Sequence, residues 1–115
     1  PAQLADRYCA VDTEIGGVQL KAGDQVTAVL GSANRDPAVF DNPDRFDLQR
    51  TDCLAHLGFG DGIHYCLGAP LVRKVAPVGF KILLDQLPHL QLAGLPQWQT
   101  DPYLRSVVNL PVSIG

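Results

Sequence analysis

The sequence lacks a long hydrophobic run, because proline, glycine or charge interrupts each apolar stretch well short of the ~20 residues that a membrane helix needs. It also lacks basic runs, basic stripes interleaved with aromatic residues, internal repeats and low-complexity segments, and its formal net charge is −3. A mildly acidic chain of this kind is not typical of general nucleic-acid binders. We therefore expect neither a membrane nor a nucleic acid among its partners.

Cysteine is scarce, and the three present, Cys9, Cys53 and Cys66, are irregularly spaced. An odd number with such spacing makes a poor disulfide framework and favours a reducing compartment, so we expect a cytoplasmic protein. A signal-peptide pattern is also missing, and the chain begins on Pro1 rather than on methionine. These features indicate a piece of a longer protein.

What is present suits a small globular unit. The 115 residues are 46% hydrophobic, which is ordinary for one domain or part of one. The stretch from Glu14 to Leu20 predicts a hairpin that turns at Gly16-Gly17, a strong two-residue turn signal. Alternation predicts a strand from Gln25 to Leu30. With a short strand from Tyr8 to Val11, these segments would form one small antiparallel sheet.

The main helix is expected from Pro70 to Leu87. Proline is favourable in its first turn, and apolar residues surround most of its sides, which is typical of a buried helix. Pro77 lies inside this helix, where it removes one backbone hydrogen bond and costs ~3 kcal/mol, so we expect a bend near residues 73–77. Further expected elements are one helical turn at 31–35, a long irregular loop at 36–57, a loop at 94–102, and terminal strands at 90–92 and 107–114.

The most informative stretch runs from Phe59 to Gly68, with Cys66 directly before the predicted helix. Its glycines permit left-handed backbone and a close approach to a flat ligand. A cysteine at a helix start has its thiolate stabilised by the free amides and the dipole there. Phe59 is suited to packing and His64 to hydrogen bonding, so the stretch can hold a thiolate against a metal. The alternative is that Cys66 is merely a small buried hydrophobic residue.

The spacing F-x-x-G-x-x-x-C-x-G in this stretch resembles the haem-binding loop of the cytochrome P450 superfamily. The resemblance extends over essentially the whole chain, and the soluble bacterial members of the family are the most similar type. The further segments that carry it are Arg7, Ile15-Gly16-Gly17, Asn34-Arg35-Asp36-Pro37, Asn42-Pro43-Asp44-Arg45-Phe46, His56-Leu57-Gly58 and Pro111-Val112.

The resemblance implies an α+β fold, the C-terminal part of the cytochrome P450 fold, with a small antiparallel sheet, a long meandering loop and one buried helix. Residues 1–115 would form an incomplete C-terminal haem-thiolate portion of that fold. The family's oxygen-activating helix and its E-x-x-R helix are absent from the sequence. The implied activity is haem-thiolate monooxygenation, in which O₂ is activated for C–H hydroxylation, but these residues alone are not expected to be competent.

The resemblance also implies the roles of individual residues. Cys66 would be the axial ligand of the haem iron, since a thiolate ligand favours O–O cleavage. His64 and Arg7 would bind the haem propionates; the alternatives are a loop histidine that caps carbonyls and a surface charge near the terminus. Phe59 would pack beside the haem. The complete set implied to bind the cofactor is Arg7, Phe59, Gly60, Gly62, His64, Cys66 and Gly68.

Partners follow from the same resemblance. Arg45 is similar to the arginine that joins a network with the missing E-x-x-R helix, without which its charge would be unpaired. Arg73 and Lys74 would lie on the face that meets an electron donor of the ferredoxin type, or else form a solvated charged edge. The missing N-terminal P450 portion, or self-association, would cover the apolar helix.

Two rival interpretations remain open. Cys53-x-x-His56 together with His64-x-Cys66 offers two sulfurs and two imidazoles, a ligand set that zinc accepts, although the separations do not match a common finger. In the second interpretation, the chain is a cofactor-free fragment that acts as an oligomerising or interaction module. Absorbance separates the three cases, as a Soret band, a zinc signal or neither.

Overall fold

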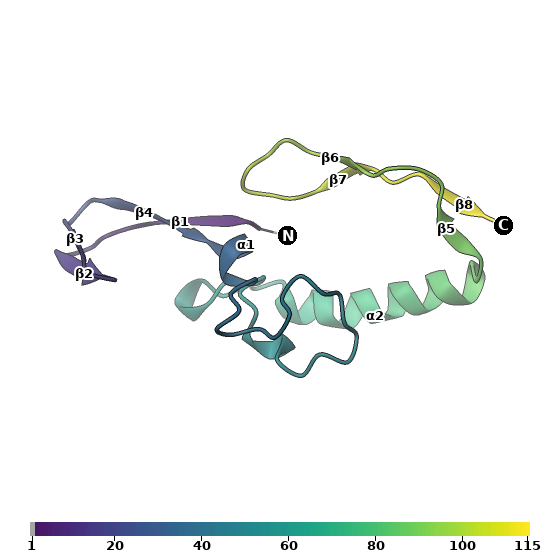
Figure 1. Ribbon diagram of the computed structural model, residues 1–115, viewed down its shortest axis with the longest axis horizontal. Coiled ribbons are helices and arrows are strands. Elements are labelled where there is room, and N and C mark those ends of the chain that lie inside the picture. The colour runs from purple at the N-terminus through teal and green to yellow at the C-terminus, as the bar shows by residue number, and fades with distance from the viewer. Residues whose placement is uncertain (1) are drawn as a thin grey trace. The chain divides into compact units, whose positions relative to one another are not determined.

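The computed structural model describes residues 2–115, which divide into two units (Figure 1). The first unit comprises residues up to Gly58 together with the short segment Pro102–Leu104, and the second comprises Phe59–Asp101 and Arg105–Gly115. No helix in the described part of the chain has both the length and the apolar character needed to cross a membrane.

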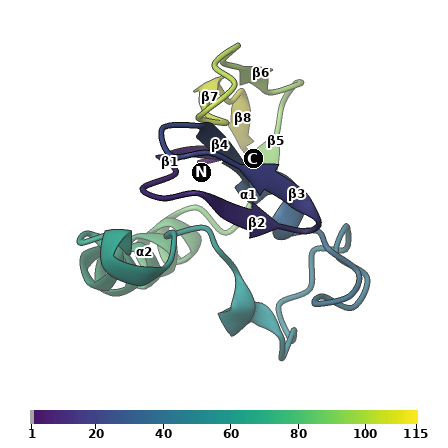
Figure 2. The same ribbon diagram turned by 90° about the vertical axis from the view of Figure 1, so that its left-hand side faces the viewer.

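Two antiparallel ribbons make up the strands of the first unit (Figure 2). Strand β1 (Leu4–Tyr8) pairs with β4 (Gln25–Val29), and β2 (Thr13–Ile15) pairs with β3 (Val18–Leu20). The β2–β3 hairpin confirms the predicted turn: Gly16 and Gly17 have φ of 59° and 81°, which glycine adopts without steric cost.

The first strand and the sheet differ from expectation. The strand predicted at Tyr8–Val11 lies earlier, at Leu4–Tyr8, because pairing with β4 fixes its position. Beyond it, the Cys9 amide donates to the Asp24 carbonyl at 2.9 Å and closes the ribbon. The strands form two separate pairs rather than the one sheet that was predicted.

The predicted helical turn and long loop are present. Helix α1 (Leu30–Ala33) follows β4 directly, and a 3-10 turn, η1 (Cys53–Ala55), is the only regular element that follows it before residue 58 within the described chain. Leu30, at the start of α1, and Phe40, in the first part of the loop, are buried. At the far end of the loop, the Leu57 amide donates to Asn34 Oδ1 at 2.6 Å, which ties the chain back to α1.

The second unit contains the 3-10 turn η2 (Gly62–His64), helix α2 (Ala69–Gln86) and two further antiparallel pairs. Strand β5 (Leu90–Leu92) pairs with β8 (Val112–Ile114), and β6 (Gln97–Trp98) pairs with β7 (Val107–Asn109). Strand β6 lies where only a loop was predicted. The predicted strand 107–114 is divided in two, because Pro111 lacks the N–H that a continuous ladder needs.

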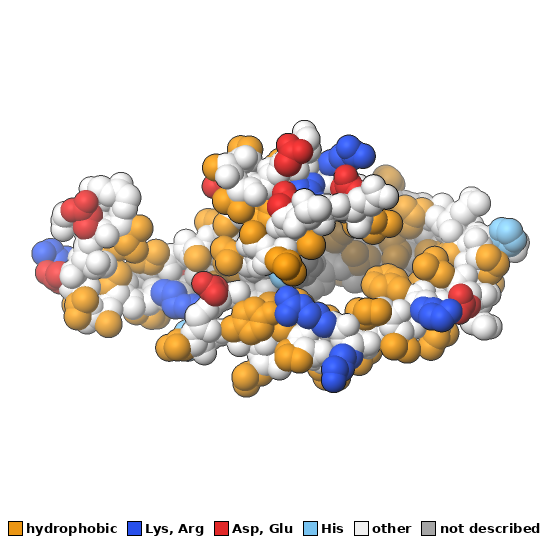
Figure 3. Space-filling model, turned by 90° about the horizontal axis from the view of Figure 1, so that it is seen from below, with side chains coloured by type: hydrophobic (Ala, Val, Ile, Leu, Met, Phe, Trp, Pro, Cys, Tyr) orange, Lys and Arg blue, Asp and Glu red, His pale blue; other side chains and the backbone are white. Residues whose placement is uncertain are grey.

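Helix α2 lies within one residue of its predicted bounds and continues through Pro77. The bend expected near that residue stays a prediction. The expected burial is not found within this chain, since Ala69 is the only buried residue of the helix, while Leu71, Phe80 and Leu84 are 64–65% exposed. Figure 3 shows hydrophobic side chains at the surface on the face that it presents. Among the described hydrophobic residues, only Leu30, Phe40 and Ala69 are buried.

Candidate functional site

The loop before α2 is closed by its own backbone. The Cys66 amide donates to the Phe59 carbonyl at 2.8 Å, and the Tyr65 amide donates to the Gly62 carbonyl at 3.0 Å, within η2. Gly60 and Gly62 have φ of 74° and 65°, a region that side chains disfavour. The two glycines therefore allow the tight path that brings Phe59 back to Cys66.

Cys66 stands at the junction of this loop with the helix. The Ala69 amide donates to the Cys66 carbonyl at 3.1 Å, and the Val72 amide donates to the Gly68 carbonyl at 3.0 Å, so α2 begins at Ala69, three residues after the cysteine. A side chain at position 68 would come within 3.7 Å of the Cys66 sulfur. The Ala69 amide therefore bonds to the Cys66 carbonyl and not to the sulfur.

The surroundings of the thiol fit a flat, apolar group with a metal at its centre. Cys66 is exposed rather than buried as a small hydrophobic residue, and Ile63 and Leu67 on either side are 98% and 99% exposed. Exposed aliphatic side chains beside a thiol gain stability when an apolar surface covers them. A single sulfur donor flanked by apolar side chains and glycine backbone therefore matches the donor set that haem requires.

The two aromatic residues of the loop are joined by a residue of α2. The rings of Phe59 and Tyr65 meet edge to face, with centroids 6.3 Å apart. The guanidinium carbon of Arg73 lies 5.1 Å from the Phe59 centroid, and Arg73 Nη1 donates to the Tyr65 hydroxyl oxygen at 2.8 Å. Arg73 therefore contacts its own cysteine loop, which neither prediction for this residue included.

The structure groups the predicted cofactor-binding residues unevenly. Six of them lie in the loop of the second unit: Phe59, Gly60, Gly62, His64, Cys66 and Gly68. His64 is exposed at the end of η2. Arg7 belongs to β1 of the first unit, is exposed, and donates through Nη1 to the Asp6 carbonyl at 2.7 Å. The roles of His64 and Arg7 toward propionates stay predictions.

The zinc interpretation gains no support. Among residues 2–115, no three side chains of His, Cys, Asp or Glu come close enough together to hold a metal ion. Cys53 and His56 lie in the first unit, whereas His64 and Cys66 lie in the second.

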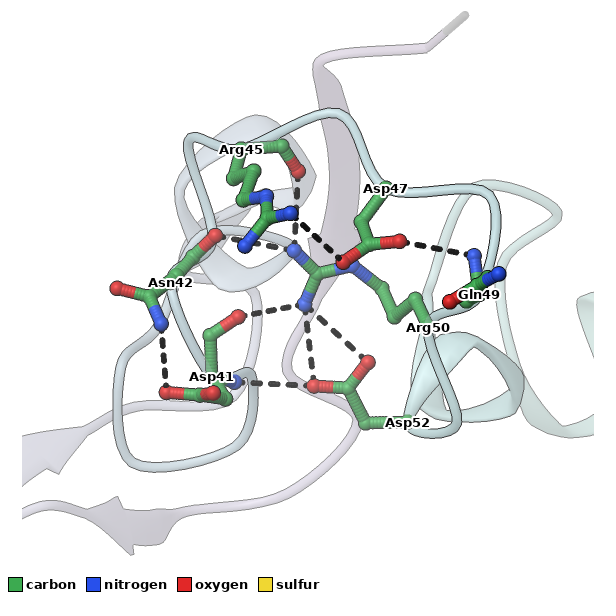
Figure 4. Close-up of polar contacts among 7 residues, drawn as sticks. All are labelled: Asp41, Asn42, Arg45, Asp47, Gln49, Arg50 and Asp52. Atoms are coloured by element: carbon green, nitrogen blue, oxygen red, sulfur yellow. Dashed lines mark hydrogen bonds and ion pairs between the residues drawn. The ribbon is translucent and has the colours of Figure 1, made fainter.

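In the loop of the first unit, the sequence directed attention to Arg45, but Arg50 organises it (Figure 4). Arg50 donates to the carbonyls of Asp41, Asn42 and Arg45 at 2.7, 3.0 and 3.0 Å, and to both carboxylate oxygens of Asp52. Its side chain is only 18% exposed. We call residues 41–52, which enclose this guanidinium, the Arg50 loop.

Arg45 is placed differently from its neighbour. It is neither buried nor unpaired: its side chain is 73% exposed, and its Nη2 lies 3.8 Å from Asp47 Oδ2. The sequence analysis missed Arg50, and the signal that could have drawn attention to it is its position among the acidic residues Asp41, Asp47 and Asp52. Sequence alone does not show which of two arginines turns inward.

The charge of Asp52 is held by the same contacts. Burial acts to raise the pKa of the Asp52 carboxyl, but the Asp41 amide, which donates to it at 2.9 Å, and the Arg50 guanidinium together hold the pKa below its usual value. Asp52 is therefore an anion at neutral pH, and the loop keeps its central ion pair.

Known proteins with sequences similar to this one are cytochromes P450. The family model described as cytochrome P450 matches residues 1–89. The polyketide biosynthesis cytochrome P450 PksS of Bacillus subtilis is 41% identical over 115 residues, covering 97% of this chain and 28% of that protein. The mycinamicin IV hydroxylase/epoxidase of Micromonospora griseorubida is 44% identical over 110 residues, covering 92% of this chain and 27% of that protein.

Solved structures give the same result. P450BioI, in complex with an acyl carrier protein ligated to hexadec-9Z-enoic acid, matches with a TM-score of 0.94 and 40% identity, covering 100% of this chain and 30% of that one. The chain thus spans less than a third of the length of these relatives. The predicted α+β fold, part of the P450 fold, is confirmed. By its sequence and by its fold, the chain belongs to the cytochrome P450 family.

Proposed function

We propose that Cys66 ligates haem iron through its thiolate, and that residues 1–115 are the C-terminal haem-binding portion of a haem-thiolate monooxygenase. The observation that carries this proposal is the exposed thiol at the start of α2, in a loop with left-handed glycines and with exposed aliphatic side chains on both sides. When bound, the haem supplies the iron at which O₂ is activated for insertion of oxygen into a C–H bond.

The residues of the chain would bind the haem and make room for it. Cys66 lies just before α2, where the positive end of the helix dipole would favour an anionic ligand atom. Phe59, whose ring meets that of Tyr65 edge to face, would pack beside the haem. His64 and Arg7 would each donate to a propionate carboxylate. Gly60, Gly62 and Gly68 leave room for the macrocycle.

Electrons for this reaction come from outside the chain, and we propose a ferredoxin-type protein as their donor. The three cysteines are free thiols, which suits a reducing compartment, and we propose the cytoplasm as the site of the reaction.

The experiment compares single cysteine variants of the purified protein supplied with haemin. Cys66→Ser is expected to abolish the thiolate-type Soret band of the reduced carbonyl complex, because serine does not supply a soft anionic sulfur. Cys9→Ser and Cys53→Ser are the matched controls and should keep the band. If Cys53→Ser abolishes the band and Cys66→Ser does not, the loop has been assigned the wrong role.

A further inference from the structure

Arg73 makes two contacts at once with the cysteine loop. Its guanidinium lies over the Phe59 ring at 5.1 Å, and the same group donates to the Tyr65 hydroxyl at 2.8 Å. We call Phe59, Tyr65 and Arg73 the Arg73 clamp. The clamp joins the residue that opens the loop, the residue directly before Cys66 and the second turn of α2.

The chemistry of the clamp depends on a planar cation. A guanidinium can stack on an aromatic face while its edge donates hydrogen bonds, whereas a lysine ammonium is a compact point charge on a flexible stem. The 2.8 Å hydrogen bond and the edge-to-face contact between the rings fix the position of Tyr65 against Phe59. The backbone bond from the Cys66 amide to the Phe59 carbonyl closes the same loop one residue later.

We propose that Arg73 is a positioning residue for Cys66, and that it acts through Phe59 and Tyr65 to hold the loop in its ligating geometry before any cofactor binds. The inference rests on the proposed ligation of haem by Cys66. It assigns the charge of Arg73 to the loop of its own chain rather than to an electron-donor protein or to solvent.

Lys74 provides a matched control. It carries the same charge on the same turn of α2, and within the described chain it has no hydrogen bond, ion pair or ring contact with the loop. A general effect of positive charge near the helix start would appear in both Arg73→Gln and Lys74→Gln. An effect of the clamp would appear only in Arg73→Gln.

The first measurement follows loss of the thiolate-type Soret band of the reduced carbonyl complex in mild denaturant, with chemical reduction so that no donor protein takes part. Arg73→Gln should speed this loss about tenfold, since it removes a ring contact and a hydrogen bond. Arg73→Lys should not restore the wild-type rate. Tyr65→Phe, which keeps the ring and removes only the hydroxyl, should speed the loss about threefold, and Lys74→Gln should leave it unchanged.

Equal rates of band loss in Arg73→Gln and Lys74→Gln, or a wild-type rate in Arg73→Gln, would contradict the proposed role of the clamp. Full rescue by Arg73→Lys would reduce the role of Arg73 to its charge and would overturn it as well. Tyr65→Phe is the mild variant that decides the matter if Arg73→Gln does not fold, and an unchanged rate there contradicts the proposal.

A second measurement separates the clamp from the proposed function. If wild-type protein shows no thiolate-type band at all, the proposed ligation by Cys66 is wrong. The clamp is then tested by hydrogen exchange of the Tyr65 and Cys66 amides in cofactor-free protein. Both amides are bonded inside the loop, at 3.0 and 2.8 Å. Arg73→Gln should speed their exchange about tenfold while Lys74→Gln does not. Unchanged exchange in Arg73→Gln would overturn the clamp.

Discussion

The Arg50 loop and helix α2 are ordered by opposite means. The loop has no regular structure, yet one guanidinium satisfies three of its carbonyls and pairs with a carboxylate. The helix runs over 18 residues with regular backbone hydrogen bonds except the one that Pro77 cannot donate, yet it leaves large apolar side chains such as Phe80 and Leu84 exposed. The polar groups around Arg50 find their partners inside residues 41–52, whereas the large apolar side chains of α2 remain mostly exposed within their own unit.

This difference shows what each region needs from its surroundings. Hydrogen bonds are directional and short, so a loop can complete them with its own atoms. Burial of apolar area is not directional and needs a facing surface, which a single helix does not supply. The order of the Arg50 loop therefore depends on one side chain, and the stability that α2 gains from its side chains depends on whatever covers them.

The largest expected effect tests the loop half of the comparison. Arg50→Met removes the donors from three backbone carbonyls at once, which costs about 3 kcal/mol at roughly 1 kcal/mol for each hydrogen bond. Proteolytic cleavage within residues 41–52 should then speed up on the order of 100-fold, if cleavage follows the population of the open loop. Limited proteolysis followed by mass spectrometry measures this rate.

Arg45→Met is the matched control, with the same change of charge in the same loop. Its ion pair with Asp47 is long and exposed, so the cleavage rate should change by less than about threefold. Similar acceleration by both variants would show that net charge, rather than the fork of hydrogen bonds from Arg50, holds the loop closed.

Much of the chain could be predicted because its signals are local. Gly16-Gly17 demands a tight turn, and both predicted bounds of α2 lie within one residue of those observed. The stretch 59–68 carries its pattern of glycines and cysteine in ten consecutive residues. In each case, the residues that determine the structure are the residues that adopt it.

Other features could not be read from the sequence, because they depend on where side chains of similar composition point. Arg45 and Arg50 are five residues apart in one acidic loop, and only three-dimensional closure turns Arg50 inward. Arg73 was expected to face a partner or solvent, yet it reaches back over Phe59. The burial expected for α2 follows correctly from its apolar pattern, but the pattern does not show whether the covering surface lies in the same 115 residues.

The second prediction tests the helix half of the comparison. Pro77 cannot donate to the carbonyl one turn earlier, and this costs about 3 kcal/mol in a helix interior, offset by about 1 kcal/mol because proline also restricts the unfolded chain. Pro77→Ala should therefore stabilise the protein by about 2 kcal/mol, measured by urea unfolding followed by helical circular dichroism.

Pro70→Ala is the control, because proline in the first turn lacks only an N–H that has no partner inside the helix. This variant should bring no gain in stability. If Pro77→Ala destabilises the protein instead, the helix requires proline at this position, and the conformation of α2 is then determined by packing and not by its own backbone hydrogen bonds.

The smallest expected effect concerns a polar contact outside both regions, which extends the comparison to the strands. Asp6 on β1 accepts hydrogen bonds from the Thr27 hydroxyl at 2.6 Å and the Tyr103 hydroxyl at 2.9 Å, and these bonds hold the pKa of its carboxyl below the usual 3.8, although burial acts to raise it. The Gln3 amide, which donates to the Tyr103 carbonyl at 2.7 Å, reports on the same contact.

Because the pKa of Asp6 is lower in the folded chain, its contribution to stability is complete above about pH 3.8 and is lost as the pH falls through the lower folded value. Hydrogen exchange of the Gln3 amide, corrected for its intrinsic pH dependence, should therefore lose protection only below that pH. In Asp6→Asn the loss should disappear, since no carboxyl remains to be protonated there.

The pKa of Asp12 is also lowered, by the Ala22 amide and by Lys21. If the loss of Gln3 protection at acid pH persists in Asp6→Asn and vanishes in Asp12→Asn, protonation of Asp6 does not cause it. The contact between β1 and Tyr103 is then held by its backbone hydrogen bonds, as α2 is, and not by the charge of Asp6.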